Sequence, residues 1–291
     1  MSEPHRLPLE AWGRASLARL QAAADGSRAG RFTFEFLMFG IKQAWACMFG
    51  GAMLLLLFTT AKLYPQHAAL ARYDFLVLSA VGLQVAMLYF RLESLDEAKV
   101  ILAFHVAGTV MELFKTSAGS WIYPEAGLLR IGGVPLFSGF MYASVGSYIA
   151  RCWRIFDFRF TAFPPDWTTW VLAAAIYVNF FTHHWIIDIR LGLFLLTAVL
   201  FWRCRIWFKP DRSVHGMPML LGFFLVACFI WLAENIGTFS HAWIYPSQHD
   251  GWTLVSPAKL GSWFLLMIIS FVLVSIVRIP TPPDSPAPIA E

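Results

Sequence analysis

Residues 217–237 read MPMLLGFFLVACFIWLAENIG, and this stretch holds a single charged residue, Glu234. An α-helix needs about 20 consecutive, mostly apolar residues to cross the hydrocarbon core of a membrane. The stretch is therefore predicted to be a transmembrane helix with one acidic side chain near its end. Whether it stands alone or belongs to a bundle depends on the rest of the chain.

The composition of the whole chain is that of a membrane protein. Of its residues 58% are hydrophobic and 14% are charged, whereas soluble domains carry about 25% charged residues. The 13 Trp residues are typical of the aromatic belts that lie at membrane–water interfaces. The net charge of +4 is scattered rather than gathered in a patch, which argues against nucleic-acid binding. The four cysteines form no paired motif, so neither a disulfide framework nor a Cys-based metal site is predicted.

The predicted fold class is all-α, a polytopic transmembrane helical bundle. About eight spans are expected, at 36–61, 74–91, 98–116, 134–152, 168–186, 190–208, 217–237 and 258–278. Lys and Arg concentrate in alternate loops, on the side of the N-terminus. By the positive-inside rule this predicts a multi-pass protein of the bacterial inner membrane with both termini cytoplasmic.

Three segments are expected along the chain. Residues 1–33 form a basic N-terminal segment, which either lies on the membrane surface or is a solvated tail. Residues 34–279 form the transmembrane domain. Residues 280–291 are rich in proline and are predicted to be disordered.

The chain also predicts an internal repeat in the same orientation, with copies at about 98–152 and 217–278. Eight residues recur at a constant offset of 122 positions: Glu112, Thr116, Trp121, Ile122, Tyr123, Pro124, Pro135 and Gly139 match Glu234, Thr238, Trp243, Ile244, Tyr245, Pro246, Pro257 and Gly261. Four spans separate the copies, so both would face the same way. A full four-plus-four duplication is an extrapolation, because spans one and two do not visibly match spans five and six.

Glu112 and Glu234 are the candidate catalytic residues. Each stands late in an apolar helix, where a carboxylate is costly and normally faces the bundle interior or a wet cavity. If the two converge, they would provide an acid and a base near neutral pH, or they would bind a cation or carry protons. The structural alternative is that each Glu ties its helix to a loop through a Trp indole, a Tyr hydroxyl or Lys115.

Each Glu is followed at the same distance by Trp-Ile-Tyr-Pro, at 121–124 and at 243–246. An aromatic belt needs aromatic residues but no fixed tetrapeptide, so a specific loop folded over the site is predicted, and an ordinary belt is the alternative. The candidate substrate-binding residues are Thr116, Trp121, Tyr123, Thr238, Trp243, Tyr245, His105, Asn179 and His183.

No metal and no cofactor are predicted. Adjacent histidines such as His183 and His184 point about 100° apart on a helix and rarely bind one ion together. A metal site that combines them with Glu112 and Glu234 is the alternative, but interfacial histidines bonded to loops are favoured. The sequence contains no phosphate-binding Gly loop and no nucleotide fingerprint.

Several longer motifs carry a family resemblance. The segments FLMFGIKQAWACMFGG, LARYDF, MELFKTSAGSWIYPE, GGVPLFSGFMYASVGSYIAR, NFFTHH and FIWLAENIGTFSHAWIYP resemble the YoaT-like family of bacterial membrane proteins, a domain of unknown function, over residues 33–278. The resemblance implies topology and no activity. A Glu late in a helix before a Gly- and aromatic-rich turn is also similar to membrane-embedded carotenoid hydratases and small lycopene cyclases, although their acidic motifs are not reproduced.

Three functions remain open from the sequence. The first is a membrane enzyme that does acid–base chemistry on a lipid-soluble substrate such as an isoprenoid, with an apolar pocket beside the two carboxylates. The second is a transporter or channel for a small solute or ion, with a polar path across the bilayer. The third is a scaffold or sensor without a cavity. The expected partners are membrane lipid and a lipid-soluble small molecule, with no nucleic acid and no protein partner.

Overall fold

The computed structural model describes residues 20–65 and 67–283. Most of the predicted N-terminal segment, 1–33, and most of the predicted tail, 280–291, lie outside these residues. Within them, the segment from residue 28 onward is already helical, and the carbonyl of Thr281 accepts a hydrogen bond from the amide of Phe160 at 2.9 Å. The chain is predominantly helical, as the sequence predicts.

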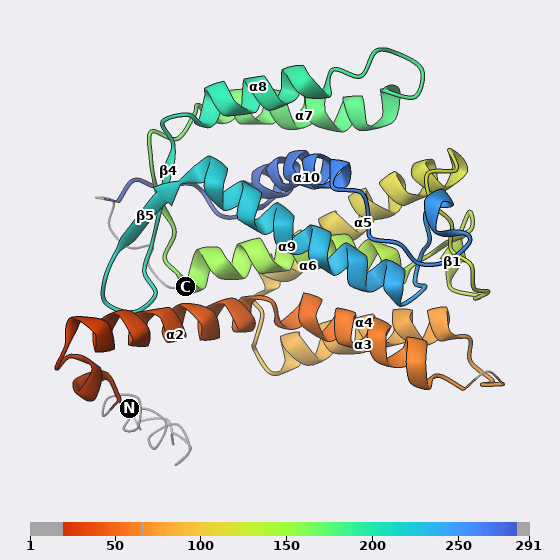
Figure 1. Ribbon diagram of the computed structural model, residues 1–291, viewed down its shortest axis with the longest axis horizontal. Helices are drawn as coiled ribbons and strands as arrows, with labels where there is room; N and C mark the ends of the chain where they lie inside the picture. Colours follow the sequence, from red (N-terminus) through yellow and green to blue (C-terminus); the bar gives the residue numbers. More distant parts are fainter. Residues whose placement is uncertain (1–19, 66, 284–291) are drawn as a thin grey trace.

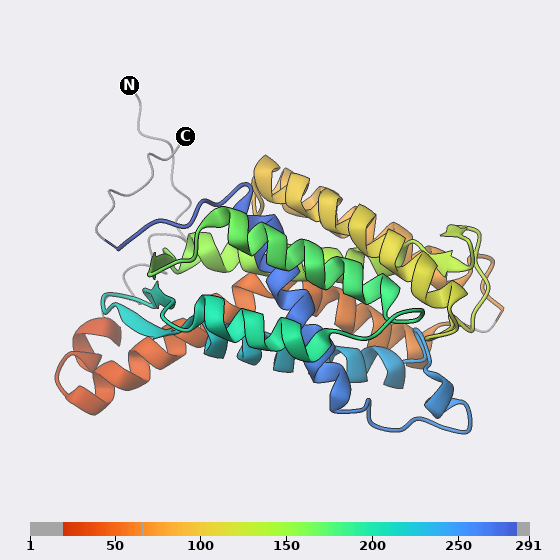
Figure 2. The same cartoon turned by 90° about the horizontal axis from the view of Figure 1, so that it is seen from above.

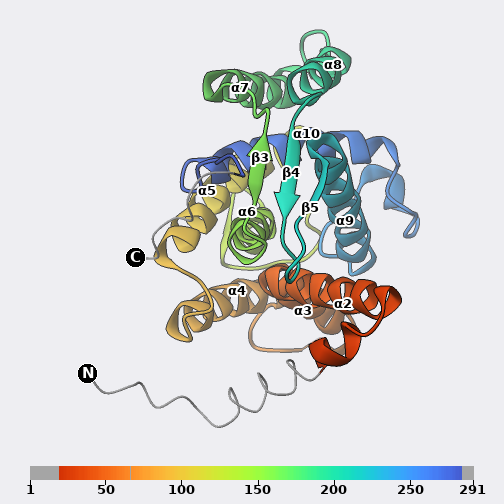
Figure 3. The same cartoon turned by 90° about the vertical axis from the view of Figure 1, so that its left-hand side faces the viewer.

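The helices lie in three layers (Figures 1 and 3). They are α2 (Arg28–Ala46), α3 (Met48–Leu63), α4 (Arg72–Tyr89), α5 (Leu95–Ser117), α6 (Phe137–Ile155), α7 (Asp166–Thr182), α8 (Arg190–Phe201), α9 (Met219–Phe239) and α10 (Ala258–Ser275). The middle layer holds α5, α6, α9 and α10. Helices α2, α3 and α4 cover one side of it, and the α7–α8 hairpin covers the other.

Three helices in the described part of the chain, α5, α9 and α10, are long and apolar enough to cross a membrane. Helices α2 and α3 together form a fourth candidate, bent by 67°. The protein is therefore a helical, membrane-associated protein. The eight predicted spans are not confirmed, because the remaining helices do not meet this length and composition.

The sixth predicted span, 190–208, is wrong in its second half. Helix α8 has 12 residues and ends at Phe201, and strand β4 (Arg205–Phe208) follows. Strand β4 pairs on both sides, with β3 (Arg159–Thr161) and with β5 (His215–Pro218), in an antiparallel sheet of order β3-β4-β5. The pairing satisfies the backbone groups of β4, which would otherwise form hydrogen bonds within a helix. Arg203 and Arg205 consequently lie outside the apolar helix α8.

Helices α5 and α6 approach each other through glycines. A Cβ atom on Gly108 of α5 would lie 2.7 Å from the Cβ atom of Tyr142, and one on Gly146 of α6 would lie 2.7 Å from the ring of Phe104. Small residues at such contacts allow two helix backbones to pack closely. Helix α5 also begins with a capping box in which Ser94 and Glu97 exchange hydrogen bonds, which satisfies two free amides of its first turn. The result is a rigid pair that carries half of the candidate site.

A short hairpin follows α5. Strands β1 (Arg130–Ile131) and β2 (Val134–Pro135) pair antiparallel across Gly132 and Gly133, whose φ angles are 53° and 87°. A two-residue hairpin turn with positive φ at both positions favours glycine. The hairpin returns the chain to α6 beside the end of α5, as Figure 2 shows from above.

Candidate functional site

Glu112 is buried in α5 and accepts three hydrogen bonds from neutral aromatic side chains. The Trp121 indole nitrogen lies 2.7 Å from one carboxylate oxygen and the Tyr123 hydroxyl lies 2.6 Å from the same oxygen. The Tyr142 hydroxyl of α6 lies 2.8 Å from the other oxygen. The carboxylate therefore joins α5, the loop that follows it and α6, and its burial is compensated by donors rather than by a cation.

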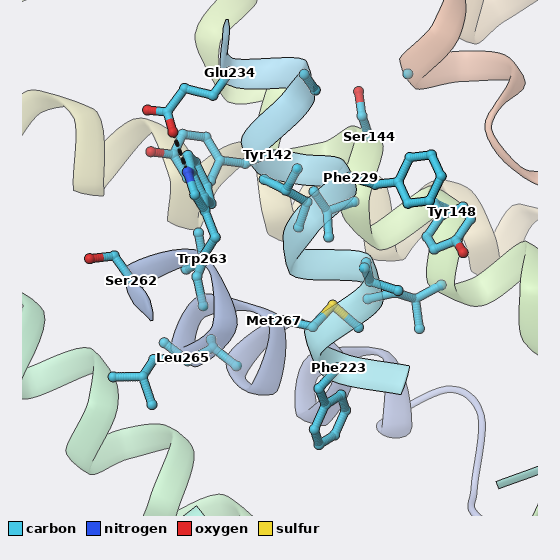
Figure 4. A pocket seen from close by; sticks show the side chains of 18 of the residues that line it. Tyr142, Ser144, Tyr148, Phe223, Phe229, Glu234, Ser262, Trp263, Leu265 and Met267 are labelled. Atoms are coloured by element: carbon cyan, nitrogen blue, oxygen red, sulfur yellow. Dashed lines mark hydrogen bonds between the residues drawn. The ribbon is translucent and has the colours of Figure 1, made fainter. Parts of the chain in front are cut away.

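Glu234 in α9 is held in a similar way. Its carboxylate accepts hydrogen bonds from the Tyr245 hydroxyl, which lies in the loop after α9, and from the indole of Trp263 in α10. Figure 4 shows the bond from Trp263, with Tyr142 beside it. Each Glu therefore accepts at least one hydrogen bond from its own Trp-Ile-Tyr-Pro loop and one from the next helix.

The aromatic donors of the two carboxylates contact each other. Trp121 and Tyr245 have ring centroids 5.9 Å apart at an interplanar angle of 81°, and Tyr142 and Trp263 have ring centroids 6.4 Å apart at 43°. The first pair is edge-to-face and the second is tilted, and aromatic contacts at these distances stabilise the two rings. The pairs connect the Glu112 and Glu234 clusters, so the two acids belong to one site.

The two Trp-Ile-Tyr-Pro loops also pair through their backbones. The amide of Ile122 donates to the carbonyl of Ile244 at 3.0 Å, and the amide of Ile244 donates to the carbonyl of Ile122 at 3.0 Å. This reciprocal pair is antiparallel. It fixes the loops to each other, and so it fixes the aromatic side chains on either side of each Ile.

Helix α4 anchors both loops through three consecutive residues. Arg72 donates to the carbonyl of Ser240 at 2.8 Å, and the Tyr73 hydroxyl donates to the carbonyl of Ala242 at 3.0 Å. The carboxylate of Asp74 accepts from the amides of Leu128 and Leu129 at 2.9 and 2.7 Å. The segment LARYDF therefore supports the site from outside, by holding loop backbone in place.

A cavity of about 1120 Å³ lies beside the two carboxylates, and both line it. Pockets for small ligands usually measure about 300–1,000 Å³, so the volume suits a large molecule. Away from the acids its walls are mostly apolar, and Figure 4 shows Phe223, Phe229, Leu265 and Met267 there. An apolar wall next to hydrogen-bonded acids is suited to a molecule that is soluble in lipid.

Basic side chains line the same end of the cavity as the two acids. They are Lys115, His183, His184, Arg190 and Lys259. Lys115 stands in the last turn of α5 and Lys259 in the first turn of α10, so both lie at the end of the bundle where α9 finishes. The cavity is therefore polar at one end and apolar along most of its length.

Most of the predicted site residues lie around this cavity. Those that line it are Glu112, Glu234, Trp121, Tyr123, Trp243, Tyr245, Asn179 and His183. Asn179 is also engaged locally, because its amide group donates to Asp188 at 3.0 Å and its oxygen accepts from the amide of Ile189 at 3.1 Å. Asn179 thus shapes the loop between α7 and α8.

Three predicted residues are not among those that line the cavity. The ring of His105 packs on Phe140 with centroids 4.4 Å apart. The Thr238 hydroxyl accepts from the Trp252 indole at 3.1 Å. The Thr116 hydroxyl is buried without a hydrogen-bond partner among the described residues.

Tyr142 and Trp263 were not predicted, although each bonds a candidate acid. Their one sequence signal is position: they stand three and two residues after the repeated glycines Gly139 and Gly261.

The ring nitrogens of His183 and His184 face the ammonium group of Lys115, at 3.4 and 2.9 Å, an arrangement that opposes a second cation there. The described residues contain no group of three or more His, Cys, Asp or Glu side chains that could hold a metal ion.

The fold and the site together define a helical, membrane-associated protein in which two buried glutamates, held by aromatic donors, border one apolar cavity. The chain belongs to the family described as "Protein of unknown function (DUF817)", which it matches over residues 35–271. It is similar to "Uncharacterized protein YoaT" of Bacillus subtilis (strain 168), with 44% identity over 244 residues that cover 84% of this chain and 92% of the relative. The resemblance to YoaT-like proteins is confirmed. No solved structure matches the chain significantly.

Proposed function

We propose that this protein is an enzyme of the bacterial inner membrane that does acid–base chemistry on a lipid-soluble substrate. The observation that carries the proposal is the contact of Glu112 and Glu234 with one large apolar cavity. An enzyme of this kind needs room for an apolar molecule and a proton donor and acceptor beside it. The chain supplies both in the same place.

In this mechanism Glu112 and Glu234 act as proton donor and acceptor. Tyr142 and Tyr245 each bond one of the acids, and a phenolic hydroxyl can both donate and accept. A proton can therefore pass between an acid and the cavity by reversal of one hydrogen bond. The indoles of Trp121 and Trp263 can only donate, so they keep the carboxylates in position.

The aromatic rings also suit a reaction that develops positive charge. The ammonium group of Lys259 lies 4.4 Å from the ring centroid of Tyr245 and 5.3 Å from that of Trp121. Lys259 occupies these faces, and the rings of Tyr142 and Trp263, which also line the cavity, have the same electrostatic character and can stabilise a cation. Substrates protonated at a carbon–carbon double bond, such as isoprenoids, form cations of this type.

We further propose that the chain is multi-pass, with both termini cytoplasmic, and that two four-helix halves repeat each other. The order α3-α4-α5-α6 is followed by α7-α8-α9-α10. Of the eight identities at an offset of 122, the Glu, the Thr and the Gly fall on α5, α6, α9 and α10, and the other five fall on the segments that connect these helices. Ile122 and Ile244, which are equivalent in this scheme, are also the residues that pair. The support for a repeat of the two halves is strongest around Glu112 and Glu234, where the identical residues lie.

The two other functions are less well supported. A transporter needs polar groups along the whole path, but the hydroxyl of Ser144, which lines the cavity, bonds the carbonyl of Phe140 instead. A scaffold was expected to bond both acids locally, as they are here, but to have no cavity. The cavity therefore favours a ligand-binding role.

Extraction of membrane lipids tests the proposal. Lipids and pigments from cells that express the wild-type chain are compared with those from cells that lack it and from cells with Glu112→Gln or Glu234→Gln. We expect the amount of one apolar compound to differ between cells with the wild type and cells that lack the chain. In cells with either variant, the amount should equal that in cells that lack the chain. Asp250→Asn is the matched control, because Asp250 is an exposed acid in the loop after α9. Profiles that are identical in all cells, with each variant present in the membrane at wild-type level, would exclude acid–base chemistry at these residues.

A further inference from the structure

The basic end of the cavity holds two lysines, Lys115 and Lys259, that form no direct ion pair within the described residues. Lys115 is 5% exposed, and the groups that contact its ammonium nitrogen are two histidine nitrogens and, at 4.3 Å, the ring centroid of Phe180. No ion pair joins Lys115 or Lys259 to a carboxylate within residues 20–65 and 67–283. An ammonium group buried without a contacting counter-ion is costly, so an anion in direct contact with it would stabilise the site.

The histidines beside Lys115 do not supply that negative charge. The Nδ1 atom of His183 lies 2.9 Å from the carbonyl oxygen of Asn179, so Nδ1 carries the hydrogen. The Nε2 atom of His183 is then free to accept from Lys115, at 3.4 Å. An imidazole ring carries no negative charge, so it does not compensate the positive charge of Lys115.

Lys259 and Arg190 lie close enough to Lys115 for the three positive charges to repel one another. Glu234 and Glu112 attract Lys259, and Asp188 attracts Lys115, but none of these carboxylates forms an ion pair with either lysine in the described chain. Lys259 contacts the faces of Trp121 and Tyr245, which leave its N–H groups without a hydrogen-bond acceptor in the described chain. Arg190 pairs with Asp188 at 3.3 Å and has further N–H donors. Three cations around one cavity end make a binding site for an acid group.

The apolar part of the cavity begins next to this basic end. Glu234 and Phe223 both line it and stand eleven residues apart on α9, which is about 16 Å at roughly 1.5 Å per residue. That length can accept an extended hydrocarbon chain. The walls along it include Phe229, Leu265 and Met267.

We propose that the cavity binds an anionic amphiphile, with its phosphate or carboxylate head between Lys115, Lys259 and Arg190 and its apolar chain along α9 and α10. The inference rests on the proposed function, because it assumes that the cavity holds a lipid-soluble molecule. It adds the chemical class of that molecule. The aromatic site of Glu112 and Glu234 then faces the part of the chain nearest the head group.

Binding of a radiolabelled fatty acid to the purified full-length chain tests the inference. The chain is held in a non-ionic detergent, and labelled palmitate is displaced with hexadecyl phosphate, hexadecanol or inorganic phosphate. We expect saturable binding of palmitate and displacement by hexadecyl phosphate. We expect hexadecanol to compete about tenfold more weakly or worse, because a lost charge-assisted hydrogen bond costs about this factor. Inorganic phosphate should not compete at similar concentrations, because it has no chain.

Matched variants locate the head group. Lys115→Gln and Lys259→Gln should weaken palmitate binding by about 10- to 100-fold, and Lys115→Arg should restore part of it. Lys62→Gln is the control, because Lys62 is exposed and does not line the cavity. Lys259 is only partly buried, so Lys259→Gln keeps the test valid if Lys115→Gln unfolds.

The outcomes separate this inference from the proposed function. Hexadecanol binding as tightly as palmitate and hexadecyl phosphate would overturn the anionic head group and leave the apolar substrate standing. Competition by inorganic phosphate as strong as that by hexadecyl phosphate would show a site for a free anion and overturn the amphiphile. A failure of every long-chain compound to bind would overturn both proposals.

Discussion

Ile122 and Ile244 exchange both backbone hydrogen bonds, each at 3.0 Å, although 122 residues separate them in the chain. They occupy the same position in the two Trp-Ile-Tyr-Pro segments. Because the pair is antiparallel, each Ile is flanked by a Trp and a Tyr whose side chains serve the shared site. This pairing links the two halves of the site directly, and it accounts for the contact of Trp121 with Tyr245.

A disulfide between positions 122 and 244 tests the pairing. Residues that exchange both hydrogen bonds have Cα atoms about 5.5 Å apart, within the range of about 4.4–6.8 Å that a disulfide spans. In a background without the four natural cysteines, Ile122→Cys with Ile244→Cys should cross-link on mild oxidation, as measured by mass spectrometry of the linked peptides. Ile122→Cys with Leu254→Cys is the control, and an equal yield from both pairs would contradict the reciprocal bridge.

Removal of the Tyr142 hydroxyl should weaken the fold through Glu112. Hydrogen bonds to charged groups contribute about 1.5–3 kcal/mol, so Tyr142→Phe should lower the free energy of unfolding by an amount in this range. In a double-mutant cycle with Glu112→Gln the two effects should be non-additive by about 0.5–3 kcal/mol. Denaturation in detergent measures each variant. Strict additivity would mean that the 2.8 Å contact contributes no coupling.

Gly108→Ala should displace Tyr142. The added Cβ atom would lie 2.7 Å from the Cβ atom of Tyr142, which cannot yield without loss of its bond to Glu112. Overpacking of this type costs about 1–3 kcal/mol, and the thermal midpoint should fall. Gly82→Ala of α4 is the control, because nothing lies within 4 Å of its added Cβ atom; that variant should be neutral or slightly more stable, since alanine favours helix. Equal midpoints for the two variants would argue against the tight α5–α6 contact.

Arg72→Lys should destabilise the loops around the site despite the retained charge. The guanidinium group donates to Thr60 at 3.1 Å and to the carbonyls of Leu57 and Ser240 at 3.3 and 2.8 Å. A lysine cannot reproduce this planar set of donors, and each buried acceptor left unpaired costs about 1–3 kcal/mol. Increased protease cleavage in the loop after α9 would report the change. Arg203→Lys, at an exposed position, should leave cleavage unchanged, and the prediction fails if Arg72→Lys does the same.

The candidate acids and their loop partners were accessible from the sequence, because the spacing from Glu to Trp-Ile-Tyr-Pro is constant in both copies. Tyr142 and Trp263 were not. Their contacts depend on how α6 and α10 rotate against the acids, which no local pattern encodes. The basic end was missed for the same reason, since Lys115, Arg190 and Lys259 are distant in sequence and meet only when three helices are assembled.

The fold was predicted best where apolar runs are long. The predicted spans 98–116, 217–237 and 258–278 fall on α5, α9 and α10, which meet the length and composition of a membrane span. The sheet β3-β4-β5 was missed because its strands are short and because α7 and α8 separate β3 from β4, so that this pair forms only when the helices are assembled. The 67° bend after Ala46 was also missed, because the apolar run continues through Cys47.

The central claim is that an apolar molecule occupies the cavity beside Glu112 and Glu234, and mass spectrometry of compounds that co-purify with the chain tests it most directly. Gly222 lines the cavity, and its added Cβ atom would meet only Met217, at 3.4 Å, so Gly222→Phe should fill space without unfolding the helix. We predict a near-stoichiometric apolar compound with the wild type and with Gly82→Phe, and its loss with Gly222→Phe. Equal amounts of every compound in all three preparations would contradict the account.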